Sequence, residues 1–128
     1  MIVVDGSVLV IAVTEATERS AVVQTALVAG VVAPHLVDAE VGQALRAMVR
    51  RGQLASDAAI RSLLAARDLV RERVPHHPYS RRAWELRDNL SFYDALYVAV
   101  AEERSLPLLT ADARLAASPG PRCEFELV

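Results

Sequence analysis

The 128-residue chain contains no lysine and only one cysteine, Cys123. A single cysteine excludes an internal disulfide and a zinc site built from cysteines, and it fits a reducing compartment. Without lysine, further cysteines or a cluster of histidines, no amine or thiol nucleophile and no site for a softer metal competes with the carboxylates. These absences direct attention to the aspartates and glutamates.

The sequence also lacks a long uninterrupted apolar run. Asp5 interrupts the apolar N-terminus, which has no basic stretch before it, and residues 21–37 are broken by Gln24, Gly30 and Pro34. Neither segment has the character of a targeting signal or the length of a membrane span. We therefore expect a soluble cytoplasmic protein with no membrane association.

Aromatic residues are scarce, at 5%, whereas 53% of the residues are hydrophobic and 23% are charged. This composition excludes wholesale disorder, and alanine and valine suit helices packed closely on a buried sheet. The length predicts a single domain over residues 1–128.

All 14 basic residues are arginine, and ten of them lie between Arg46 and Arg87, where only four acids occur. Arginine is well suited to bidentate phosphate contacts. The same arginines also suit the solvated faces of helices. The net charge is −2, so the basic stretch permits RNA binding without establishing it.

Short apolar strands alternate with helices along the chain, which predicts an α/β fold with a parallel sheet covered on both faces. His76 and His77, between prolines, are predicted to lie exposed in a loop after a short extended piece at Val74. We expect strands at 2–4, 31–33, 106–110 and 123–128, and helices at 7–29 (broken near 14–17), 34–51, 56–73, 79–89, 91–104 and 112–117.

Four acids follow or flank these strands. Asp5 directly follows the first strand, Glu40 lies in the second turn of the helix after the second strand, and Asp112 follows the strand that ends at Thr110. Asp94 lies in the first turn of the apolar helix 91–104, on the face of the buried Tyr97. Right-handed crossovers bring the carboxyl ends of parallel strands to one edge, where ligands bind. At least three of the four acids are therefore expected to meet.

Each acid also has a purely structural explanation. Asp5 and Asp112 could cap the helices that follow them, and Asp94 completes a Ser-x-x-Asp capping box with Ser91. Asp38 is a rival to Glu40, but its position in the first helical turn is explained by the helix dipole. Glu40 lies on the flank of the apolar stripe of its helix and has no comparable explanation beyond surface exposure.

Converging carboxylates cannot all remain ionised without a partner. Mg²⁺ or Mn²⁺ would supply one, because these hard cations take oxygen ligands together with waters and substrate phosphate. Such a site can activate water and stabilise displacement at a phosphodiester. The sequence thus predicts metal-dependent phosphodiester chemistry.

The motifs that carry these acids resemble those of PIN domains, and specifically of VapC-type toxin ribonucleases from VapBC toxin–antitoxin pairs. The resemblance covers essentially the whole chain. It rests on VVDGS around Asp5, on LVDAEVGQALR with Glu40, and on NLSFYDALYVAVAEERSLPLLTAD with Asp94, Thr110 and Asp112.

The resemblance implies a PIN-like three-layer α/β/α sandwich with a short, mainly parallel sheet. It also implies a Mg²⁺- or Mn²⁺-dependent endoribonuclease in which Asp5, Glu40, Asp94 and Asp112 bind metal and Ser7 and Thr110 support them. Relatives cleave structured RNA such as tRNA or rRNA, inhibit translation, form homodimers and are neutralised by a VapB-type antitoxin. Some carry a further acid after the last one, where this chain has alanine and arginine, so a second metal ion remains open.

Two alternatives compete with this interpretation. A phosphoaspartyl receiver domain would need a lysine at the active edge, and a haloacid-dehalogenase-like phosphatase would need an aspartate where Ser7 stands. A catalytically silent PIN-like module that binds RNA or protein would use Asp94 and Asp112 only as caps. Glu40 argues against this second alternative.

Overall fold

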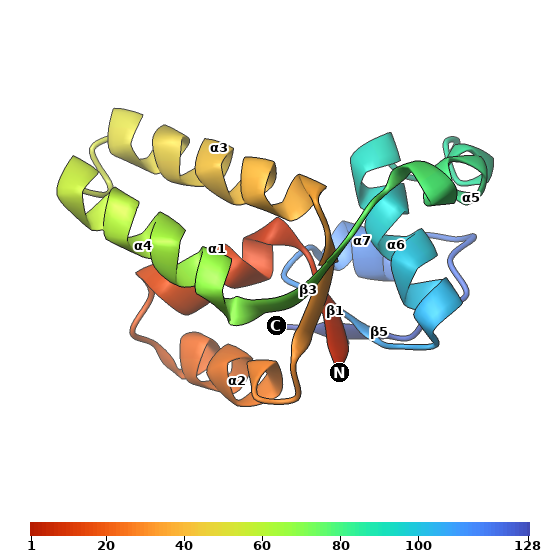
Figure 1. The fold of residues 1–128 in the computed structure, drawn as a ribbon, viewed down its shortest axis with the longest axis horizontal. Helices are drawn as coiled ribbons and strands as arrows, with labels where there is room; N and C mark the ends of the chain where they lie inside the picture. The colour runs from red at the N-terminus through yellow and green to blue at the C-terminus, as the bar shows by residue number, and fades with distance from the viewer.

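A five-stranded, wholly parallel sheet forms the centre of the protein (Figure 1). The computed structural model describes all residues, 1–128. The strand order is β3-β2-β1-β4-β5, so the first strand is the central one. The strands are β1 (Ile2–Val4), β2 (Val31–Pro34), β3 (Val70–Val74), β4 (Leu108–Thr110) and β5 (Phe125–Leu127).

Seven helices cover the two faces of this sheet, α1 to α4 on one side and α5 to α7 on the other (Figure 1). The predicted three-layer α/β/α sandwich with a parallel sheet is therefore confirmed. The helices are α1 (Gly6–Thr14), α2 (Glu18–Leu27), α3 (Leu36–Arg50), α4 (Ser56–Leu69), α5 (Ser80–Glu85), α6 (Phe92–Arg104) and α7 (Ala113–Ala117).

The core lies between the central strands and the helices. All residues of β1, β2 and β4 are buried, as continuous apolar strands require in a sheet covered on both faces. Helix α6 is the most enclosed helix, with every residue from Ala95 to Ala101 buried. This burial explains why its sequence is apolar nearly all round. No helix has both the length and the apolar character that crossing a membrane requires.

Most predicted elements are present, and the expected break in the first helical region is confirmed. Helix α1 ends at Thr14, and α2 begins after Thr17, whose side chain forms a capping box with Ser20. His76 and His77 are both exposed, as expected. Pro34, which was expected to open a helix, instead ends strand β2.

The predicted helix 56–73 is wrong in its last part, because α4 stops at Leu69 and strand β3 follows directly. Only Val70 and Val74 of this edge strand are buried, and the charged residues between them hid the strand from pattern analysis. Helix α5 covers only part of the predicted 79–89 and follows a short 3₁₀ turn at His77–Tyr79. Strands β4 and β5 are shorter than predicted.

Candidate active site

The carboxyl ends of β1 and β4 form the point where the direction of the chain through the sheet reverses. From β1 the chain moves by way of one helical layer to β2 and β3, and it then returns by the other layer to β4 and β5. Parallel sheets bind their ligands at such a switch point. Asp5 follows β1 here, and Thr110 ends β4 beside it.

Asp5 is buried, with 6% of its surface exposed, and three donors hold its carboxylate. The Ser7 hydroxyl and the Val8 N–H donate to Oδ1, and the Thr110 hydroxyl donates to Oδ2 over 2.6 Å. The Val8 contact makes Asp5 the N-cap of α1, in agreement with its structural explanation. The other two contacts are not needed for a cap, so the carboxylate is held in one orientation at the sheet edge.

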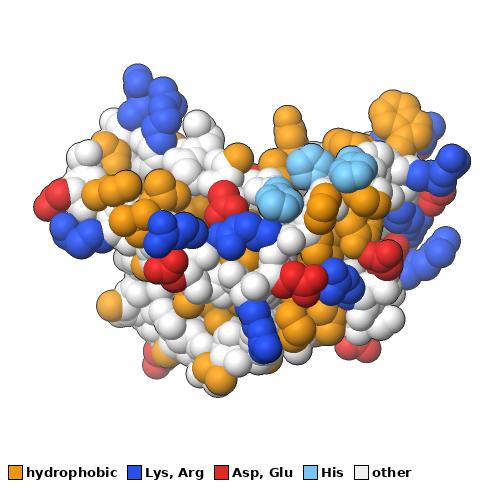
Figure 2. All heavy atoms as spheres, in the orientation of Figure 1, with side chains coloured by type: hydrophobic (Ala, Val, Ile, Leu, Met, Phe, Trp, Pro, Cys, Tyr) orange, Lys and Arg blue, Asp and Glu red, His pale blue; other side chains and the backbone are white.

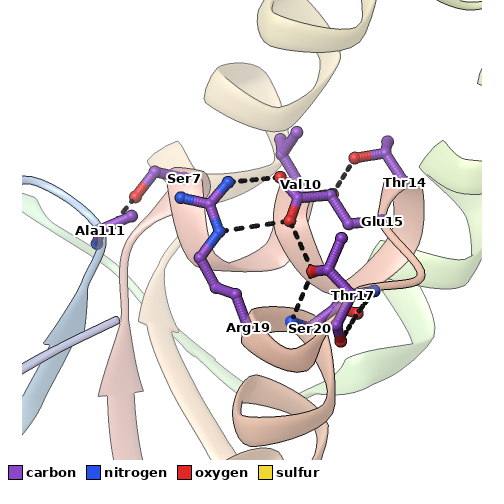
Figure 3. A network of polar contacts seen from close by, with 8 residues as sticks. All are labelled: Ser7, Val10, Thr14, Glu15, Thr17, Arg19, Ser20 and Ala111. Carbon is purple, nitrogen blue, oxygen red and sulfur yellow. Dashed lines mark hydrogen bonds and ion pairs between the residues drawn. The ribbon is translucent and has the colours of Figure 1, made fainter.

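Ser7 connects this carboxylate to the residue that follows the neighbouring strand β4. Its hydroxyl also accepts a long hydrogen bond of 3.4 Å from the N–H of Ala111 (Figure 3). The same view shows Arg19 of α2 paired with Glu15 at the end of α1. Ser7 and Thr110 therefore both lie against Asp5, where the resemblance places supporting polar residues.

Glu40 lies on α3, where it packs against Gly6 at the start of α1. A Cβ atom at Gly6 would lie 3.0 Å from the Glu40 Cβ, so a glycine is what lets the two helices come this close. The Oε1 atom of Glu40 is buried and has no hydrogen-bond partner. Burial raises the pKa of the Glu40 carboxyl, the Tyr97 hydroxyl opposes this, and the charges of Asp5 and Asp94 raise it further.

Tyr97 of α6 is fully buried, and its hydroxyl also lacks a hydrogen-bond partner. It lies close enough to Glu40 for each group to affect the pKa of the other, yet no hydrogen bond of normal geometry joins them. Burial is the main reason why the pKa of Tyr97 lies above its usual value. The helical spacing places Tyr97 on the face of Asp94, but it does not predict that the Tyr97 hydroxyl and a Glu40 oxygen both lack hydrogen-bond partners.

Asp94 is only half explained as a capping residue. Its N–H donates to the Ser91 hydroxyl over 3.1 Å, but the reciprocal hydrogen bond from the Ser91 N–H to the Asp94 carboxylate is absent. Burial raises the pKa of Asp94, with the Ser91 hydroxyl opposing this and the charges of Asp5 and Asp112 adding to it. The capping box therefore does not account for the carboxylate.

Asp112 lies at the exposed rim of the site. Its Oδ1 accepts hydrogen bonds from the N–H groups of Arg114 and Leu115, so the residue does cap α7. Its own N–H donates to the Thr110 hydroxyl over 3.0 Å. Thr110 therefore links Asp112 to Asp5.

The rival acid Asp38 is excluded from the site, because Arg73 of β3 forms a bidentate ion pair with it. The Nε and Nη2 atoms of Arg73 lie 2.6 and 2.8 Å from the two carboxylate oxygens of Asp38. Asp5, Glu40 and Asp94 lie within range of one another's charge, and Asp112 joins them through Asp94. No three histidine, cysteine or acidic side chains are arranged to ligate one ion together as they stand. The structure thus gathers the four acids at one edge without forming a closed cage.

Comparison with known proteins agrees with this fold. The sequence profile of the PIN domain matches residues 2–120. Ribonuclease VapC1 of Mycobacterium tuberculosis is 50% identical over 97 residues, 75% of this chain and 73% of that protein. Ribonuclease VapC12 of the same species is 35% identical over 128 residues, 100% of this chain and 99% of the relative.

Solved structures are similar as well. The crystal structure of PAE2754 from Pyrobaculum aerophilum gives a TM-score of 0.71 at 28% identity, covering 96% of this chain and 81% of that one. The structure of Mycobacterium tuberculosis VapC20, titled a sarcin-ricin loop cleaving toxin, gives 0.65 at 22% identity and covers 91% and 94%. The chain belongs to the PIN domain family. Its relatives place it within that family among the VapC-type ribonuclease toxins.

Proposed function

We propose that this protein is a Mg²⁺- or Mn²⁺-dependent endoribonuclease whose metal is held by Asp5, Glu40, Asp94 and Asp112. The observation that carries the proposal is the set of acids with no basic partner at the switch point of the sheet. In contrast, Asp38 on the same helix as Glu40 has an arginine partner. Buried carboxylates without a counter-charge are costly unless a cation or a proton neutralises them.

The donor set suits a hard cation. Glu40 offers a buried oxygen without a hydrogen-bond partner, and the carboxylate of Asp94 is not used by its capping box. The raised pKa values of both groups reflect the cost of holding neighbouring negative charges in a partly buried place. Mg²⁺ usually binds one or two protein carboxylates and completes its shell with waters and phosphate, so a closed cage of three is not required.

The residues of this chain have different roles in the proposal. Ser7 and Thr110 orient the Asp5 carboxylate toward the site, and Thr110 also fixes Asp112 at the rim. Glu40 and Asp94 close the site from the two helical layers. When bound, the metal ion supplies the Lewis acidity that activates water and offsets negative charge at a phosphodiester.

The substrate we propose is structured RNA, tRNA or rRNA, with inhibition of translation as the result. The names of the relatives, all VapC ribonucleases, support RNA as the substrate, and the VapC20 neighbour is described as cleaving the sarcin-ricin loop. Among the ten arginines between residues 46 and 87, the six that form no ion pair could contact phosphates: Arg46, Arg50, Arg51, Arg71, Arg81 and Arg87. Mapping RNA 5′ ends after induced expression would identify the target.

We also propose a VapB-type antitoxin and a second copy of this chain as partners. Helix α4 exposes Ile60 and Leu64, one turn apart, at 51% and 43%. An apolar strip of this kind is typical of an interface. Chromatography with light scattering should show a dimer at micromolar concentration, and a stable monomer would count against self-association.

The catalytically silent alternative draws support from Asp5 and Asp112, which do cap helices. It leaves Glu40 and Asp94 without a role. A silent module would bind RNA without cutting it under any metal condition.

The decisive experiment is cleavage of total RNA with and without metal. Cleavage should stop in EDTA and return with Mn²⁺ or Mg²⁺, and Asp94→Asn should abolish it. Asp38→Asn is the matched control, since it also removes one carboxylate near the site, and it should retain activity. Cleavage that persists in EDTA, or an active Asp94→Asn protein, would overturn the proposal.

A further inference from the structure

A cleft of about 670 Å³ opens beside the four acids, between α3 and the start of α6. We call it the α3–α6 cleft. Glu40 and Asp94 are part of its lining, so it is continuous with the proposed metal site. Figure 1 shows these two helix ends approaching each other from opposite layers, and Figure 2 shows the surface hollowed between the layers. The other lining residues are Leu36, Ala39, Gln43, Ala44, Ala47, Ser91 and Tyr93.

We propose that the α3–α6 cleft binds one unstacked base of the RNA, adjacent to the phosphate that is cut, with Tyr93 stacking on the base and Gln43 reading its edge. This inference rests on the proposed ribonuclease function and adds a residue-level source of sequence preference. The volume of the cleft falls within the range of small-ligand sites, and a nucleobase fits it.

Tyr93 is available for stacking, because 62% of its surface is exposed and no hydrogen bond or cation–π contact occupies its ring. Trp84 is equally exposed, at 61%, but Arg87 covers its ring at 4.8 Å, and it lies outside the cleft. Proteins that recognise single-stranded or looped RNA commonly stack bases on exposed aromatic rings. Phe92, 41% exposed, is also uncovered but does not line the cleft, so of the three exposed rings only Tyr93 is both free and part of the cleft.

The remaining lining suits a flat, uncharged group with polar edges. Ala39, Ala44 and Ala47 have small side chains that leave a shallow apolar floor along α3. Gln43 is exposed and carries both a donor and an acceptor, which is what discrimination between base edges requires. The carboxylates of Glu40 and Asp94 at one end disfavour a phosphate or an acidic peptide inside the cleft itself.

The first test measures binding separately from cleavage. A short, fluorescein-labelled single-stranded RNA of degenerate sequence is titrated in EDTA, where no cleavage is expected, with protein whose acids are all intact, and anisotropy is recorded. The Tyr93→Ala substitution should raise the Kd for this RNA about tenfold, which is the effect expected from the loss of one stacked base. Tyr93→Phe should preserve binding, and Trp84→Ala is the matched control that should leave it unchanged.

The second test follows sequence preference. With otherwise wild-type protein and a random RNA pool, Gln43→Ala should relax the base preference at one position beside the cut while total cleavage falls less than fivefold. Tyr93→Ala should raise KM more than it lowers kcat. Unchanged binding and unchanged preference in these variants would overturn the inference.

Two further outcomes distinguish base binding from self-association and from a failure of the proposed function. A protein that fails to cleave RNA would contradict the proposed function, yet the binding titration would still decide whether Tyr93 contacts a base. If Tyr93→Ala instead converts a dimer to a monomer with RNA affinity unchanged, the cleft is a contact between copies of this chain, and the base-binding inference is wrong.

Discussion

Thr110 donates a hydrogen bond of 2.6 Å to Oδ2 of Asp5, a residue 105 positions earlier in the chain. Asp5 directly follows β1 and Thr110 ends the adjacent parallel strand β4, and both residues are buried. The same hydroxyl accepts the N–H of Asp112 over 3.0 Å. One side chain therefore sets the positions of two of the four acids.

We expect Thr110→Val to impair the site while keeping the fold. The valine has nearly the same shape but cannot donate to Asp5, so the unfolding free energy should fall by about 2 kcal/mol. Metal affinity or RNA cleavage should fall by about tenfold to a hundredfold, as is typical when a residue that orients a metal ligand is lost. Thr110→Ser should restore most of both properties. Equal activity in the valine variant would show that Asp5 needs no such support.

Metal binding is expected to depend on Asp5 and Asp94 together. Each substitution, Asp5→Asn or Asp94→Asn, removes one negative charge with little change in shape. Calorimetric titration with Mn²⁺ should show a large loss of affinity in each variant relative to wild type. Unchanged affinity in both variants would remove the basis for a metal site at this sheet edge.

Glu40→Gln should stabilise the metal-free protein at neutral pH, by on the order of 1 kcal/mol, because it removes a partly buried charge that has no basic partner. The pKa of Glu40 is raised in the folded state from 4.5. Folded wild-type protein therefore binds the proton more tightly than unfolded protein, and its stability falls as pH rises from 4.5 through the folded pKa. The stability gained by Glu40→Gln over wild type should therefore increase as pH rises through this range and should be absent below pH 4.5. Thermal melts of both proteins in EDTA at several pH values would measure it.

Asp38→Asn, on the same helix, is the control, because its effect on stability should have the opposite sign to that of Glu40→Gln. Its hydrogen bonds with Arg73 lower the pKa of Asp38 below 3.8, so the charged form stabilises the fold above that pH, and this contribution is lost on acidification through the folded pKa. The variant should therefore be less stable than wild type at pH 7 and similar to it in strong acid. A Glu40→Gln protein that also loses stability at pH 7 would contradict the assigned charge environment.

Gly6→Ala should displace Glu40. The added Cβ would lie 3.0 Å from the Glu40 Cβ, so α3 must move away from α1, at a cost of about 1–3 kcal/mol. RNA cleavage should also fall, because Glu40 moves with α3. Gly42→Ala, on α3 itself, is the matched control, because the added Cβ would meet only Leu63, at 4.0 Å. This variant should be more stable than wild type by about 0.5–1 kcal/mol, since alanine has the higher helix propensity. A fully active Gly6→Ala protein would mean that the position of Glu40 is not critical.

The sequence predicted the parallel sheet well, because a sheet of this kind follows from general rules. Short apolar runs marked β1, β2 and β4, and right-handed connections bring the residues after them to one edge. Strand β3 was missed because it continues directly from α4 and carries charged residues at the sheet edge, which imitates a solvated helix end. Local pattern alone cannot separate these two cases.

Details of the site escaped prediction for a different reason. The contact between Gly6 and Glu40 depends on how closely two helices pack, and nothing in the spacing of residues reports that distance. The unpaired hydroxyl of Tyr97 similarly depends on rotamers in the finished core. The competition between Asp38 and Glu40 was resolved by Arg73, which comes from the strand that pattern analysis missed.

The central position of β1 has a consequence for biosynthesis. Strand β1 is made before its neighbour β4, whose Thr110 hydroxyl holds Asp5 although it lies 105 positions later in the chain. A nascent chain that has not yet released residues 108–112 from the ribosome therefore has an incomplete site.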